Sequence, residues 1–295
     1  MGSPQPRIRI QVFALSVLTT MSFFSILMRR WFWFALLPTL VASGQMHPAA
    51  ESTQSDLPVI GAAPPAGMIP PSPTWRYPNG ETYVYGVEWH MFNAGVSKVT
   101  IQSDANQEHV SGVADSSGFV GSLYKVHDRF DAFFDPHTLC SSRVSKHTEE
   151  GAHERDTQIN FNYAQHQSVM EEKNLKTGEL KRAESDIGPC VTDVVSGFYY
   201  LASLPLQPGS TYNFEVSDGK TSKVKAYVEG REEVKVPTGK FETLRVKVEA
   251  TSGSLQGKGT VWAWFTDDAG HIPVQMKSKM TFGTLMFKMQ RIDKQ

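Results

Sequence analysis

Residues 82–89 read Thr-Tyr-Val-Tyr-Gly-Val-Glu-Trp, and this stretch decides the fold class. Successive side chains of a β-strand point to opposite faces, so a period of two is the mark of a strand. Here that period gathers Tyr83, Tyr85, Val87 and Trp89 on one face. The stretch therefore predicts a strand with one aromatic face.

The same period of two recurs through the rest of the chain. Residues 244–248 alternate apolar and charged side chains, as in a strand with one wet face, and residues 223–228 and 285–289 follow a similar pattern. Residues 261–265 carry apolar side chains at both parities, which predicts a strand buried on both sides. Asp218-Gly219 lies between two such runs and is typical of a two-residue hairpin.

About a dozen strands with turns between them predict one long antiparallel meander. A sheet of that size has to curl or close. We therefore expect a mainly β domain that forms a strongly curved sheet or an incomplete barrel.

Residues 191–204 break this pattern and predict one short helix. Val194, Phe198 and Leu201 belong to an apolar stripe at helical spacing. Thr192 or Asp193 can cap its N-terminus, and the following proline ends it. The helix should separate a β first half of the domain from a β second half.

The N-terminal residues differ from everything after them. Within residues 1–44, two arginines precede the apolar run 31–41, and small residues follow at 42–44, which is the layout of a secretory signal peptide. Met28 stands directly before the arginines, so translation is hypothesised to start there. The alternative is a retained membrane anchor, because the 10–28 stretch is just long enough to span a bilayer.

Residues 45–75 are rich in proline among Ala, Gly and Ser, which predicts an extended linker. A single β-rich domain is then expected over residues 76–295. We expect the protein in the periplasm or secreted, with an inner-membrane protein anchored through its N-terminus as the alternative.

Several stretches of this domain resemble domain of unknown function 3108, a family of exported bacterial proteins. They are residues 77–85 with Asn-Ala-Gly at 93–95, Asp-Val-Val-Ser-Gly-Phe-Tyr-Tyr-Leu at 193–201, the prolines and glycine of 205–209, the stretches 230–234 and 238–241, and Val-Trp, Asp-Asp and Ile-Pro-Val within 261–274. The family's helix usually continues to an arginine, whereas Ala202-Ser203 stands here. The resemblance covers roughly residues 76–290 and implies export and a curved, mostly antiparallel fold, with no established reaction.

Composition narrows the chemistry. The 29 Lys and Arg against 30 Asp and Glu leave a net charge of −1, which argues against a nucleic-acid partner because duplex binding needs a clustered positive field. In an exported chain, Cys140 and Cys190 are expected to form a disulfide. The alternative is two separate thiols.

No catalytic, cofactor or metal motif stands out in the sequence. Gly257-Lys258-Gly259 precedes a strand rather than a helix, so it is not a phosphate loop. The pair Asp267-Asp268 lies where a hairpin turn is expected. Five histidines are crowded between residues 127 and 166, but no pair has a legible metal-ligand spacing, and we expect solvated side chains; they are His127, His137, His147, His153 and His166.

Five aromatic residues are the candidate ligand-facing side chains on the concave face, with core filling as the alternative: Tyr83, Tyr85, Trp89, Trp262 and Trp264. The favoured function is non-catalytic binding of an apolar or amphipathic ligand, or of an envelope component, in the concavity. An envelope hydrolase with an unrecognised site and a structural interaction module remain the alternatives. Membrane contact is expected only through the signal sequence or an uncleaved anchor.

Overall fold

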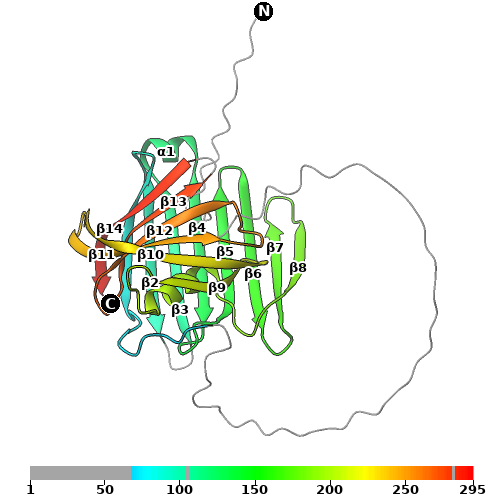
Figure 1. Cartoon of the computed structure of the whole chain (residues 1–295). Coiled ribbons are helices and arrows are strands. Elements are labelled where there is room, and N and C mark those ends of the chain that lie inside the picture. Colours follow the sequence, from blue (N-terminus) through cyan, green and yellow to red (C-terminus); the bar gives the residue numbers. More distant parts are fainter. Residues whose placement is uncertain (1–67, 104–106, 281–282, 295) are drawn as a thin grey trace, which may run out of the picture. The chain divides into compact units, whose positions relative to one another are not determined.

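The computed structural model describes residues 68–103, 107–280 and 283–294. This part of the chain folds into fourteen strands and two helices (Figure 1). The strands are β1 (Glu81–Trp89), β2 (Phe92–Ser103), β3 (Glu108–Ser116), β4 (Val126–Phe134), β5 (Ser141–Glu150), β6 (His153–Asn162), β7 (Gln167–Asn174), β8 (Leu180–Asp186), β9 (Thr211–Ser217), β10 (Thr221–Val236), β11 (Gly239–Ala250), β12 (Gly259–Thr266), β13 (Pro273–Met280) and β14 (Gly283–Lys294). The helices are α1 (Gly118–Leu123) and α2 (Val194–Ser203).

All fourteen strands belong to one antiparallel sheet, which confirms the predicted fold class. Its order is β8-β7-β6-β5-β4-β3-β2-β1-β14-β13-β12-β11-β10-β9. Each half is a meander, and β1 pairs with β14 to join them in the middle of the sheet. The strands β8 and β9, which flank α2 in sequence, therefore form the two opposite edges.

The sheet curves so strongly that the turn at one end contacts strands at the other end. The turn between β9 and β10 reaches the strands of the first half, where the Ser185 hydroxyl donates to the Gly219 carbonyl at 2.9 Å. Lys146 of β5 forms a buried ion pair with Asp218 in the same turn. The two edges are not paired with each other, so the sheet is an unclosed, strongly curved one.

The two edges are protected from further strand pairing in different ways. Beside β9, the segment before α2 adds backbone hydrogen bonds: Thr192 N donates to Glu215 O at 3.1 Å, and Ser217 N donates to Thr192 O at 2.8 Å. Strand β8 carries charged side chains at four of its seven positions. Charge on an edge strand opposes pairing with another chain.

Helix α2 is close to its predicted position and is capped by Asp193, whose side chain accepts from the amides of Val195 and Ser196. The Ser196 hydroxyl completes a capping box with the backbone amide of Asp193, at 3.0 Å. The Ser141 hydroxyl donates to the Asp193 carboxylate at 2.7 Å, so β5 holds the cap in place.

The core lies between α2 and the sheet. Tyr199 contacts the rings of Tyr77 and Phe134, which belong to the first half of the domain. Phe198 contacts Phe265 on β12, 5.3 Å between ring centroids. One helix therefore packs against both halves of the sheet.

Two features differ from the sequence expectation or add to it. Helix α1 was not predicted: it has only six residues, including two glycines, so no helical period can show. Residues 68–75, the end of the expected linker, contact α2, since Ile69 N donates to the Tyr200 hydroxyl at 3.0 Å and Ser72 N donates to Ser203 O at 2.7 Å.

The predicted signal region at 1–44, the hypothetical start at Met28 and the first part of the linker, up to residue 67, lie outside the described residues. Among the helices of the described part, neither is long and apolar enough to cross a membrane.

Candidate functional site: an apolar cavity beside helix α2

An apolar cavity of about 110 Å³ lies between α2 and the second half of the sheet. Val194, Gly197, Phe198 and Leu201 of α2 line it. These positions follow the spacing i, i+3, i+4 and i+7, which is one face of a helix. The apolar stripe visible in the sequence therefore covers the cavity along one side.

The opposite wall comes from five consecutive strands of the sheet. The lining side chains are Phe214 and Val216 of β9, Val224 of β10, Val248 and Ala250 of β11, Val261 of β12, and Ser278 and Met280 of β13. Glu249 of β11 and Gly259 of β12 also border the cavity. Phe214, Val216 and Val224 are buried, whereas Val248, Ala250 and Met280 are only half-buried. The cavity thus opens toward the ends of β11 and β13.

The loop between β11 and β12 borders the opening through Leu255 and Lys258. Its conformation is fixed by Ser222 of β10, whose hydroxyl accepts from Leu255 N at 3.0 Å and lies 3.2 Å from the Ser254 hydroxyl. Gly253 has φ +85°, a conformation that favours glycine. A Cβ atom at this position would lie 2.4 Å from the Thr221 carbonyl oxygen, so there is no room for a side chain. The loop is therefore held against β10 by local contacts that place Leu255 at the rim.

None of the five aromatic residues singled out in the sequence lines this cavity. Tyr83 and Tyr85 are buried in the core, where the Tyr83 hydroxyl donates to Glu81 at 2.6 Å and the Tyr85 hydroxyl donates to the Pro273 carbonyl at 2.9 Å. Burial raises the pKa of Tyr85 well above its ordinary value. Trp89 is half-buried and lies against His90.

Trp262 and Trp264 belong to the face of β12 that points away from α2, because Val261 lines the cavity and Phe265 contacts Phe198 on the other face. Trp264 Nε1 donates to Glu232 at 3.1 Å, and the Lys277 ammonium lies 5.3 Å from the Trp262 ring centre. Ligand contact at the five aromatics stays a prediction. The cavity offers a different set of residues.

Cys140 and Cys190 form the expected disulfide, with 5.3 Å between their Cα atoms. It links the residue before β5 to the segment before α2. The Tyr163 hydroxyl lies beside this link and contacts the carbonyls of Ser141 and Val191 at 2.7 and 3.1 Å. The start of α2 is thus fixed to the first half of the sheet, while the helix face lines a cavity in the second half.

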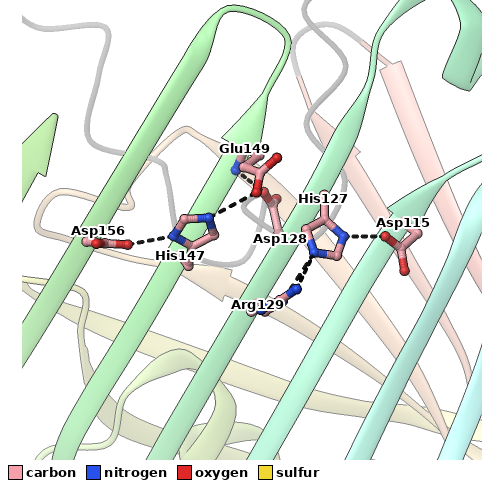
Figure 2. A network of polar contacts seen from close by, with 7 residues as sticks. All are labelled: Asp115, His127, Asp128, Arg129, His147, Glu149 and Asp156. Carbon is pink, nitrogen blue, oxygen red and sulfur yellow. Dashed lines mark hydrogen bonds and ion pairs between the residues drawn. The ribbon is translucent and has the colours of Figure 1, made fainter. Parts of the chain in front are cut away.

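Two of the crowded histidines, His127 and His147, pair with carboxylates on strands β3–β6 (Figure 2). His127 Nδ1 lies 2.5 Å from Asp115, and Arg129 donates to His127 Nε2 at 3.1 Å. His147 bridges Asp156 at 2.6 Å and Glu149 at 3.1 Å. Figure 2 shows the two groups side by side on neighbouring strands.

The hydrogen bond to Asp156 is the main cause that raises the pKa of His147, and Glu149 adds to it. Partial burial opposes this shift. His137, His153 and His166 lie in or next to turns and strand ends. Over residues 68–103, 107–280 and 283–294, no group of three or more His, Cys, Asp or Glu side chains is placed to hold a metal ion. The histidine–carboxylate pairs also contribute no residue to the apolar cavity.

A second polar group lies inside the first half of the sheet. Asp128, Lys146 and Glu150 are buried there, and Glu150 is fully inaccessible. Burial and the nearby carboxylates of Glu150 and Asp128 raise the pKa of Tyr124 to about 12. The interior of the first half therefore contains buried charged side chains beside its apolar core. The cavity of the second half is lined mainly by apolar side chains.

Comparison with solved structures finds matches at low sequence identity. A β-barrel-like protein of domain of unknown function DUF1849 from Brucella abortus superposes with a TM-score of 0.52 and 9% identity, over 73% of this chain and 97% of that one. The hypothetical protein CT021 from Chlamydia trachomatis gives a TM-score of 0.34 and 8% identity, over 74% of this chain and 88% of that one. At these identities the first likeness concerns the fold alone.

No curated protein matches the sequence of this chain. A family model does match, and it covers the region in which the sequence resemblance was found. It spans residues 84–290, from strand β1 to strand β14. The chain therefore belongs to the family described as protein of unknown function DUF3108.

Proposed function

We propose that this protein is an exported, non-catalytic binding protein that holds a small apolar group in the cavity beside α2. The observation that carries the proposal is the cavity itself, an open apolar space lined by one helix face and five strands. Native cores are close-packed, so an unfilled apolar cavity is unusual. Apolar cavities that open to the surface are the sites at which proteins commonly bind small ligands.

The size of the cavity limits what it can hold. An apolar cavity of about 150 Å³ in another protein stays dry and binds benzene. A space of about 110 Å³ therefore suits one ring or a short alkyl chain. A larger ligand would place its remaining atoms at the opening near Leu255.

Export is supported by two independent features. The arrangement of residues 1–44 is that of a secretory signal peptide. The disulfide between Cys140 and Cys190 is the kind of bond that persists in oxidising compartments. The periplasm or the extracellular medium is therefore the proposed location.

The proposal is tested by titrating the protein with 1-hexanol while the methyl resonances of Leu201, Val216 and Val248 are followed by NMR. The expected result is saturable shifts at these methyl groups. Ala250→Phe should abolish them by filling the cavity from its rim. The matched control is Ala152→Phe, which adds the same ring at an exposed turn between β5 and β6.

If Ala250→Phe disturbs folding, Leu255→Trp offers a second way to occupy the opening from the loop. Unchanged hexanol binding in both folded variants would show that the cavity is not the site. Saturable shifts that are confined to another region would have the same meaning.

A further inference from the structure

We infer that the ligand is an anionic amphiphile whose short apolar part enters the cavity and whose charged group is bound by Lys258 at the opening. This inference rests on the proposed function and assigns the chemical class of its ligand. Its basis is the charge distribution around the cavity.

Only two of the lining residues carry charge, Glu249 and Lys258. The Glu249 carboxylate lies 2.7 Å from the Lys247 ammonium and is neutralised by it. Lys258 forms no ion pair with any residue that the structure describes. The opening therefore carries one uncompensated positive charge.

Backbone hydrogen bonding and the adjacent strand fix the position of Lys258. Its amide donates to the Leu255 carbonyl at 3.2 Å, and it directly precedes Gly259, the first residue of β12. Gly257 adopts φ +70°, a conformation that favours glycine, and completes the turn. Lys258 is thus placed next to the apolar rim formed by Leu255.

The interior of the cavity cannot hold the charge itself. Burying an ionised group without partners is unfavourable by many kcal/mol, and α2 lines the cavity with four apolar residues. The anion must therefore remain at the opening. There, the apolar walls lower the local dielectric and strengthen its attraction to Lys258.

The chemical class that fits is a single short chain or ring that carries a carboxylate, sulfate or phosphate group. A cationic ligand would be repelled by the positive charge of Lys258, and no free carboxylate among the described residues at the opening would offset that repulsion. A neutral apolar molecule would fill the cavity but leave the lysine unused. The cavity size excludes two long chains from the enclosed space.

The experiment compares hexanoate with 1-hexanol, which share a chain length and differ in charge. In the full protein, Lys258→Ala should weaken hexanoate binding about two- to fivefold, the range of an exposed charge pair, and Lys258→Glu should weaken it further. Hexanol affinity should change by a smaller factor than hexanoate affinity in both variants, because hexanol carries no charge. Raising the salt concentration should weaken hexanoate binding only in the protein that retains Lys258.

Lys279→Ala is the matched control. Lys279 lies between Ser278 and Met280, which both line the cavity, so the alternation of β13 directs its side chain to the other face. An equal loss of hexanoate binding in Lys279→Ala and Lys258→Ala would overturn the inference, as would no loss in Lys258→Ala. If hexanol binds while Lys258 has no effect, the apolar site stands and the anionic class fails. If neither probe binds the wild-type protein, both proposals fail.

Discussion

At the scale of single residues, the interior contains a buried ion pair besides its apolar core. Lys146 and Asp218 are both almost fully buried, with side-chain exposures of 8% and 6%. Burial raises the pKa of the Asp218 carboxyl, while the charge of Lys146 opposes that shift. This pair holds the β9–β10 turn to β5, so a buried polar contact helps to bring the ends of the sheet together.

We expect Lys146→Met to destabilise the protein by about 3–5 kcal/mol, because it leaves the Asp218 carboxylate buried without its cation. Lys146→Met combined with Asp218→Asn should recover part of the loss, since no charge is then stranded. Urea unfolding of the wild type and the two variants measures both effects. A single variant that loses less than about 1 kcal/mol would contradict the role given to the ion pair.

The His147 site predicts a pH-dependent contribution to stability. Contacts with Asp156 and Glu149 raise the pKa of His147 above its unfolded value. The contribution is therefore fully present below the unfolded pKa and disappears as the pH rises through the folded pKa. Because the imidazole is about a third exposed, we expect less than about 1 kcal/mol.

Asp156→Asn should accordingly reduce stability at pH 5 and have little effect at pH 9. Asp293→Asn is the control, because its partner Arg291 keeps its charge across this range. Equal effects of Asp156→Asn at both pH values would contradict a protonated His147 in the folded protein.

At the scale of elements, α2 connects the two halves of the domain. Its N-terminus is held to β5 by Ser141 and by the disulfide of Cys140 and Cys190. Its Phe198 packs on β12 and its apolar face lines the cavity. The position of this helix therefore determines both the joining of the halves and the width of the cavity.

Replacing both cysteines by alanine should lower the free energy of unfolding by about 4 kcal/mol on the chain-entropy account, because the two residues are 50 positions apart in sequence. Amide hydrogen exchange in α2 should accelerate more than in β14, which lies in the middle of the sheet. An unchanged urea midpoint and unchanged exchange in α2 would show that the disulfide does not stabilise the helix.

The sequence predicted these elements well where a local period or a turn residue carried the information. The strand at 82–89 and the capped helix near 191–204 follow from near neighbours in the chain. The hairpin at Asp218-Gly219 is also present, but the prediction of a two-residue loop was wrong: Ser217 pairs with Thr221, which leaves the three residues 218–220 in the loop. For strand β12 the sequence pattern was not informative. Both of its faces are apolar, so the sequence could not decide that Val261 faces the cavity and Trp262 the opposite side.

At the scale of the whole domain, the pairing of β1 with β14 makes one sheet from two meanders. It places the edge strands β8 and β9 at opposite ends of the strand order, and the curvature then brings the β9–β10 turn back to β8. No local signal specifies this pairing. The cavity could not be predicted either, because its walls come from α2, five strands and a loop that are spread over residues 194–280.

The central claim is that this cavity binds an apolar group, and intermolecular NOEs between bound 1-hexanol and the protein test it most directly. The account predicts NOEs from the alkyl chain to the methyl groups of Leu201, Val216 and Val248, with Leu255 near the hydroxyl end. The absence of these NOEs at saturating hexanol, or their appearance only outside the cavity, would contradict it.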